Sequence, residues 1–393
     1  MLHLAMPIIG CTGAPECPEG FYAGPEGACY EGTGGGDDTG TPDTGDADTD
    51  ADADADTDAD TDTDTDTDTG DTGVELLDSF SYGELSDVIA WDGPTHFLAT
   101  NPAENSLDLI DVTTGDYISR VALGGSPSRV TGDPATGTAY VVHGAGSLNR
   151  MDIVDVIAGT NRQILLNSGG VNYAGTDVAL GPSGVVYVLA DGDSGASSES
   201  VLEIDAAGTI TTVWLLGESS NVDPPMLWQD GLLYAEFWRF RFDSAPSLAT
   251  ERQYADGTWP SPSHVALSPD GVGILFSGDD ERSAVEYDTN TAAILNQFDL
   301  ADGDAAGAND LVYSYDGTRV IALVLVGTQL QIQVFDRVTS TELRNENIGA
   351  DDGAASYETE ILVVSSDDAN VWTYVFDPIW NADEGIFMRV PIP

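Results

Sequence analysis

One motif returns along the chain from residue 85 onward, at intervals of about 40–50 residues, and it constrains the fold more than any other feature. Each copy is a short apolar run, a turn rich in Pro, Asp, Ser or Gly, and a second apolar run, which is the pattern of a β-hairpin. The clear copies are SDVIAWDGPTHFLAT (86–100), SRVTGDPATGTAYVV (128–142), TDVALGPSGVVYVLA (176–190), SHVALSPDGVGILFS (263–277), NDLVYSYDGTRVIAL (309–323) and TEILVVSSDDANVWTYV (359–375), and PPMLWQDGLLYAE (224–236) is a weaker seventh.

Most hairpins are followed by a third apolar run, a turn and a fourth run, as in LDLIDVTTGDYISRVAL (107–123) and AVEYDTNTAAILNQFDL (284–300). The Asp before this turn is placed to accept hydrogen bonds from the N–H groups of the turn. Each repeat is therefore expected to form four antiparallel strands. Four-stranded units at this period are typical of a β-propeller, whereas a set of β-sandwiches would not repeat one motif seven times. The expected fold class is all-β, a seven-bladed propeller.

The strand count predicts how the ring closes. After Glu360 the chain holds only three apolar runs, at about 359–366, 370–376 and 384–391. The segment VELLDSFSY (74–82) precedes the first repeat and has no other partner. We expect it to supply the missing fourth strand of the last blade, which would latch the ring and remove an exposed sheet edge.

The repeats, above all HVALSPDGVGILFSG (264–278), resemble the YVTN/lactonase-like family of seven-bladed propellers. The resemblance covers roughly residues 75–393. It implies the fold and leaves the activity open, because such propellers include enzymes, electron carriers and binding scaffolds.

Four segments are expected. Residues 1–11 resemble the end of a bacterial lipoprotein signal, residues 12–36 form a small Cys-containing loop, residues 37–73 form an Asp/Thr-rich linker, and residues 74–393 form the propeller. The linker has an aspartate at every second position from Asp46 to Asp68. It has no large apolar residue to bury and its carboxylates repel one another, so it is expected to be disordered and extended.

The start of the chain contains Ile8-Ile9-Gly10-Cys11, which resembles a lipobox. That resemblance implies lipidation at Cys11, export, and a membrane partner at the outer membrane or cell surface. The stretch before Cys11 is shorter than the usual signal and carries no basic residue. Cys17 and Cys29 are the remaining cysteines, and in an exported chain we expect them to pair as a disulfide.

Charge excludes one class of partner. The chain carries 68 acidic residues, 12 arginines and no lysine, for a net charge of −56. Phosphate binding needs clustered basic side chains, so we expect no nucleic-acid partner. The linker should attract cations along its length, although no closed metal site is evident in it.

Aligning the repeats places one residue of each blade just before the first apolar run, where it would face the central channel. The ligand-binding candidates at this ring are Asp87, Arg129, Asp177, His264, Asp310 and Glu360, and Pro225 is the seventh position. Close carboxylates would raise each other's pKa or recruit a cation such as Ca²⁺. The alternative is that these residues cap turns or lie in channel water. We identify no catalytic residue, and the metal content stays open.

These observations favour a cell-envelope lipoprotein that displays a binding or scaffold propeller on an acidic stalk, with a protein or a small polar ligand as partner and without catalysis. One alternative is a lactonase-like or other metal-assisted hydrolase that uses the channel residues. Another is a calcium-responsive adhesion or assembly module.

Overall fold

The structure is a computed structural model that describes residues 21–23, 29–31, 79–144, 149–192, 199–216, 226–229, 232–235, 238–244, 247–254, 262–278, 283–300, 308–326, 329–350, 361–365, 367–376 and 384–393. The chain divides into two units, Met1–Gly70 and Asp71–Pro393. In the first unit, β1 (Phe21–Ala23) pairs with β2 (Cys29–Glu31) as a short antiparallel hairpin. Cys11, Cys17, the Asp-rich linker and the side chain of Cys29 lie outside the described residues.

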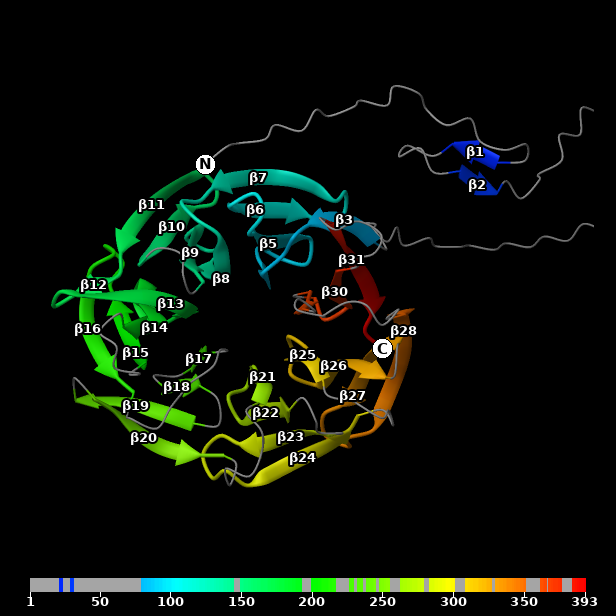
Figure 1. The fold of residues 1–393 in the computed structure, drawn as a ribbon. Helices are drawn as coiled ribbons and strands as arrows, with labels where there is room; N and C mark the ends of the chain where they lie inside the picture. Colours follow the sequence, from blue (N-terminus) through cyan, green and yellow to red (C-terminus); the bar gives the residue numbers. More distant parts are fainter. Residues whose placement is uncertain are drawn as a thin grey trace, which may run out of the picture. The chain divides into compact units, whose positions relative to one another are not determined.

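The second unit is a seven-bladed β-propeller, as the repeats predict (Figure 1). Its blades surround a central opening, and in blades one, two, four, five and six the strands pair in chain order from the inside out. Blade three does the same from β13 to β16, and its short strand β12 pairs with β13 near the outer rim of the ring. Blade one comprises β4 (Asp87–Ala90), β5 (His96–Asn101), β6 (Ser106–Asp111) and β7 (Asp116–Ala122). Blade two comprises β8 (Pro127–Asp133), β9 (Thr138–His143), β10 (Arg150–Asp155) and β11 (Thr160–Leu165). Blade three comprises β12 (Asn167–Ser168), β13 (Val171–Leu180), β14 (Val186–Gly192), β15 (Glu199–Ile204) and β16 (Ile210–Leu215). Blade four comprises β17 (Met226–Gln229), β18 (Leu232–Ala235), β19 (Trp238–Ser244) and β20 (Ser247–Gln253). Blade five comprises β21 (Pro262–Leu267), β22 (Gly273–Gly278), β23 (Ser283–Asp288) and β24 (Ile294–Asp299). Blade six comprises β25 (Ala308–Tyr313), β26 (Arg319–Val326), β27 (Gln329–Asp336) and β28 (Glu342–Ala350).

The seventh blade closes the ring with a strand from the front of the domain. It comprises β29 (Ile361–Val364), β30 (Asn370–Phe376) and β31 (Glu384–Pro391), and its outermost strand is β3 (Ser79–Gly83). β3 pairs antiparallel with β31, with Phe80 opposite Phe387. The predicted latch is therefore confirmed for the described part of its segment.

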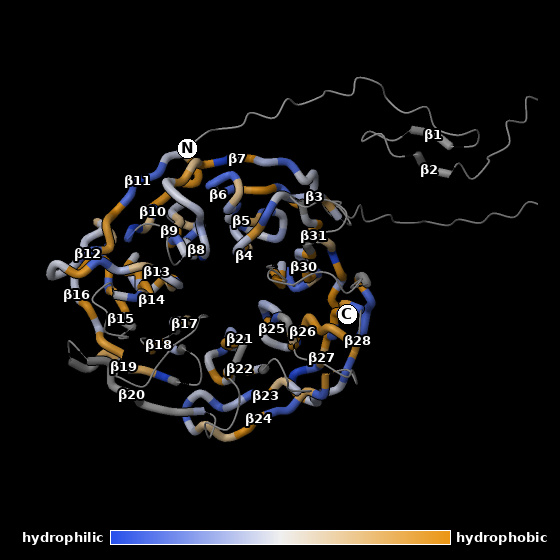
Figure 2. The backbone as a smooth tube through the Cα atoms, viewed as in Figure 1, coloured by the Kyte–Doolittle hydropathy of each residue, from blue (hydrophilic) through white to orange (hydrophobic). Residues whose placement is uncertain are grey.

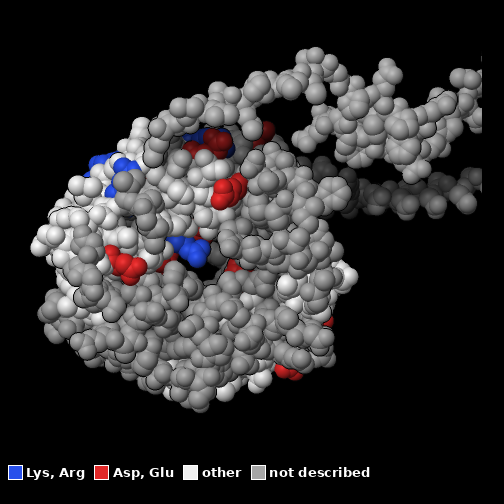
Figure 3. Space-filling view, in the orientation of Figure 1, with Lys and Arg blue, Asp and Glu red and all other residues white. Residues whose placement is uncertain are grey.

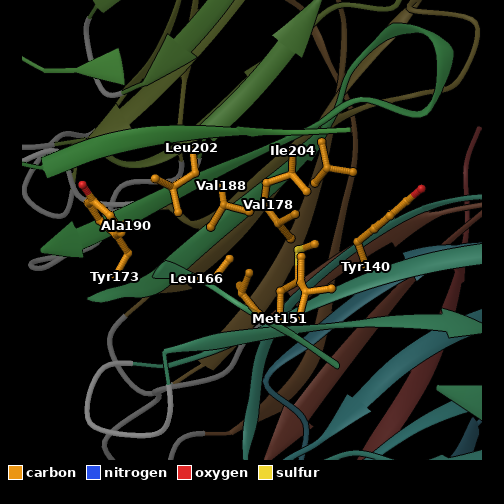
Figure 4. Close-up of a cluster of buried hydrophobic side chains, with 12 residues drawn as sticks. Tyr140, Met151, Leu166, Tyr173, Val178, Val188, Ala190, Leu202 and Ile204 are labelled. Carbon is orange, nitrogen blue, oxygen red and sulfur yellow. The ribbon is translucent and has the colours of Figure 1, made fainter. Parts of the chain in front are cut away.

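Burial along the strands explains why the blades pack as they do. Middle strands such as β26 are buried along most of their length, because a blade is covered on both faces by its neighbours. Outer strands such as β7 are largely exposed. Figure 2 shows hydrophobic and hydrophilic residues interleaved around the ring. Each interface holds its own apolar cluster; in Figure 4, Met151 of blade two packs with Val178 and Leu202 of blade three.

The turns between the third and fourth strands are capped as the sequence predicts. Asp111 accepts hydrogen bonds from the Thr113 N–H and hydroxyl, at 2.8 and 2.6 Å. Asp336 does the same for the N–H and hydroxyl of Thr339, both at 2.9 Å. These short-range bonds satisfy turn N–H groups and fix the hairpins locally.

Blades three and four share one nine-stranded sheet, which the repeats do not indicate. The outer strands β16 and β20 run parallel and pair at Leu215 and Ser247. The only helical segment among the described residues is the 3₁₀ turn η1 (Pro182–Gly184). None of the described segments is a helix long and apolar enough to span a membrane.

Candidate functional site: the central channel

A cavity of about 940 Å³ occupies the centre of the propeller. Its walls come from the innermost strand of every blade, namely β4, β8, β13, β17, β21, β25 and β29. Acidic and arginine side chains meet at the rim of the central opening in Figure 3. All seven repeats contribute to this surface.

Asp87, Asp177 and Asp310, here called the three channel aspartates, lie at equivalent positions of blades one, three and six. Each carboxylate accepts a hydrogen bond from the next N–H of its own strand, at 3.0, 2.7 and 2.7 Å respectively. The second oxygen of each accepts an N–H from the first strand of the following blade. The acceptor and donor pairs are Asp87 with Val130 (2.8 Å), Asp177 with Met226, and Asp310 with Leu362 (2.7 Å).

This arrangement joins blades around the channel. A first strand has neighbouring strands on one edge only, so its inner edge leaves N–H groups that need partners. The carboxylate supplies acceptors for two of them and bridges the seam between neighbouring blades. The three aspartates thus line the cavity and accept N–H groups of strands, whereas the alternative from the sequence had them cap turns or lie in channel water.

Arg129 occupies the same position in blade two and behaves differently. Its guanidinium nitrogen Nη1 lies 3.9 Å from Oδ1 of Asp87, and its side chain is 37% exposed. The structure gives this guanidinium no hydrogen bond to the described residues, although it lines the cavity. Burial acts to lower the pKa of Arg129, but the three channel aspartates raise it, so Arg129 keeps its charge.

Two of the channel aspartates, Asp87 and Asp177, have a raised pKa. Burial raises the pKa of Asp87 to about 6, with Arg129 and the Val130 N–H acting in the opposite direction. Burial also raises the pKa of Asp177, again opposed by Arg129. One guanidinium and three carboxylates leave an excess of negative charge among the described channel residues.

The remaining ring positions lie partly outside the residues that the structure describes. His264 is in β21, opposite Ser277 of β22, but its side chain is not described. Glu360 and Pro225 lie outside the described residues. Among the residues that the structure does describe, no group of three or more His, Cys, Asp or Glu side chains is arranged to hold a metal ion.

The structure adds aromatic residues that the alignment of ring positions missed. Trp228 of β17 lines the cavity and stacks on Tyr187, with ring centroids 4.2 Å apart. Tyr315 lines it from the turn after β25 and is 68% exposed. Asp368 of blade seven holds that turn, because its carboxylate accepts the N–H groups of Tyr315 and Asp316. The only signal in the sequence was that Tyr315 replaces the proline of the related SPDG turn.

Comparison with known protein families and with curated protein sequences finds no match to this chain. The fold is established by the seven blades and the closure of their ring.

Proposed function

We propose that the protein is a non-catalytic binding propeller of the cell envelope, with the channel as its ligand site. This proposal rests on a difference between the hydrogen bonds that the ring residues make. The three channel aspartates are engaged by backbone N–H groups of two blades, whereas the guanidinium of Arg129 faces a cavity of about 940 Å³ without a hydrogen bond to the described residues. A charged fork in a preformed cavity suits recognition of a polar ligand.

The resemblance to YVTN/lactonase-like propellers and to a lipoprotein signal supports the wider role. In that role Cys11 carries the lipid, the acidic linker is a solvated spacer, and the propeller is displayed away from the membrane. Palmitate labelling of the expressed protein, compared with a Cys11→Ser variant, tests the anchor. Labelling that persists in the variant would contradict it.

Ligand binding is tested by thermal-shift screening of polar metabolites against the purified protein. A Thr131→Trp variant, which places a bulky side chain in the channel from β8, is the control, and circular dichroism checks its fold. We expect compounds that raise the melting temperature of the wild type and not of this variant. If no compound distinguishes the two proteins, the channel is not a ligand site.

One observation favours a second candidate function. With a pKa of about 6, Asp87 could exchange a proton near neutral pH, as a general base in a lactonase-like hydrolase would. Hydrolysis of a lactone panel, with and without Ca²⁺, separates the two functions. Turnover that is abolished by Asp87→Asn and retained by Asp116→Asn, a change on the exposed strand β7, would establish the enzyme in place of the binding protein.

A further inference from the structure

Among the described residues of the channel, Arg129 makes no hydrogen bond through its guanidinium and is outnumbered by the three channel aspartates, and this combination restricts the ligand. The guanidinium of Arg129 has five N–H donors in a planar fork, which matches a carboxylate bidentately. The surrounding charge is negative, because the three channel aspartates face the same cavity. A simple anion would meet repulsion from these carboxylates, and a simple cation would leave the Arg129 guanidinium without an acceptor among the described residues.

The spacing of opposite charges points to a molecule that carries both. The closest approach of Arg129 to Asp87 is 3.9 Å, longer than a hydrogen bond. In an α-amino acid the carboxylate and the ammonium group are attached to the same carbon, so a ligand that meets Arg129 presents its ammonium group within reach of the neighbouring carboxylate.

Beyond the charged ring the channel wall becomes apolar. Ile89, Leu227 and Val312 line the cavity, and each is half-buried. Ile89 and Val312 follow Asp87 and Asp310 by two residues along β4 and β25, so they form the next layer of the same wall, to which Leu227 of β17 adds another apolar side chain. An apolar side chain attached to the zwitterion would contact this layer.

We propose that the channel binds a small zwitterion of the α-amino-acid class with an apolar side chain. The ligand carboxylate lies at Arg129 and its ammonium group lies among the three channel aspartates. This inference rests on the proposed binding function and names its ligand class.

The test uses three molecules of one carbon skeleton. Leucine has both charges, 4-methylpentanoate lacks the ammonium group, and isopentylamine lacks the carboxylate. Isothermal titration of the full chain with each, and with calcium chloride alone, compares the charge requirements directly. We expect leucine to bind at least about tenfold more tightly than either analogue, because 4-methylpentanoate adds an uncompensated negative charge beside the channel aspartates and isopentylamine offers no acceptor to the Arg129 guanidinium.

Variants locate the binding. Arg129→Gln should weaken leucine binding at least about tenfold, and Arg129→Lys should lie between it and the wild type, since a lysine keeps the charge and loses the fork. Arg162→Gln is the matched control, because Arg162 is exposed on β11 and hydrogen-bonds Ala207 away from the channel. Circular dichroism of each variant confirms that the fold is retained.

Three outcomes would contradict the zwitterion ligand. None of them contradicts the binding function, which the thermal-shift screen tests separately. They are equal binding of leucine and 4-methylpentanoate, displacement of leucine by calcium, and no binding by any of the three molecules at millimolar concentration. A thermal-shift ligand that is not a zwitterion would support the binding function while refuting the zwitterion.

Discussion

The Asp87 carboxylate of blade one accepts a 2.8 Å hydrogen bond from the backbone N–H of Val130 in blade two. These residues are 43 positions apart, about one repeat. The bond recurs from blade three to four and from blade six to seven, so the carboxylates that face the channel also hold the ring together. Any change at these positions therefore acts on stability as well as on a ligand.

Asp87 should make stability depend on pH. Its pKa is about 6 in the folded protein against an ordinary 3.8, so the folded state holds a proton in that window that the unfolded state has released. Its stabilising contribution is full below about pH 3.8 and is lost as pH rises through about 6. The loss is at most about 3 kcal/mol, since the side chain keeps 17% exposure to the channel.

Urea unfolding at pH values across this window measures the effect. The Asp87→Asn variant cannot ionise at this position and should show a correspondingly flatter dependence, whereas Asp116→Asn on the exposed strand β7 should follow the wild type. Parallel curves for wild type and Asp87→Asn would show that Asp87 ionises normally.

Tyr82→Phe should weaken the closure of the ring. The Tyr82 hydroxyl, on the latch strand, donates a buried 2.9 Å hydrogen bond to Asp108 of blade one. Arg120 donates to the same carboxylate at 2.9 and 3.0 Å. Loss of the hydroxyl should lower the free energy of unfolding by about 1.5–3 kcal/mol, the usual contribution of a hydrogen bond to a charged group. In denaturant titrations Tyr315→Phe, at an exposed turn, should match the wild type.

Phe387→Ala should open the seventh blade. Phe387 is fully buried in β31, and its ring centroid lies 5.1 Å from that of Phe80 on the latch strand and 5.1 Å from that of Tyr374. The cavity should cost about 3–5 kcal/mol. The freed edge of β31 should promote self-association, visible by light scattering after size exclusion. The neighbouring change Ile386→Ala, at a side chain that is 45% exposed, should shift stability by less than about 0.5 kcal/mol.

Arg337→Gln should destabilise the interface between blades five and six. The guanidinium of Arg337 lies 2.7 Å from the fully buried carboxylate of Glu286 and 2.9 Å from Asp270. Removing it leaves Glu286 buried without its cation, which should cost about 3–5 kcal/mol.

Adding Glu286→Gln to Arg337→Gln should recover part of that loss, because the buried charge is then gone. The matched control is Arg319→Gln, whose partner Asp336 is 3.4 Å away with both side chains 27% exposed. It should cost less than about 1 kcal/mol. A calorimetric melting series would contradict this account if the Arg337 and Arg319 variants lost similar stability.

Local pattern was enough to predict much of this architecture. Short segments are enough to predict the hairpin repeats and the capping residues such as Asp111. The number of strand segments predicts that the last blade lacks one strand. Closure follows, because a blade with three strands leaves an edge that the segment ending near Tyr82 is able to fill. The same alignment also brought Asp87 and Arg129 to equivalent positions.

Contacts between blades could not be predicted in this way. The packing of neighbouring blades decides three features of the structure. They are the hydrogen bond from Val130 to Asp87, the lack of a hydrogen bond from the Arg129 guanidinium to the described residues, and the pairing of β16 with β20. Partners of these kinds come from segments tens of residues apart, and burial changes the energy of their charges. Neither the partners between blades nor the burial of their charges can be predicted from the order of residues within a single repeat. The chemistry of the channel therefore depends on the assembled ring.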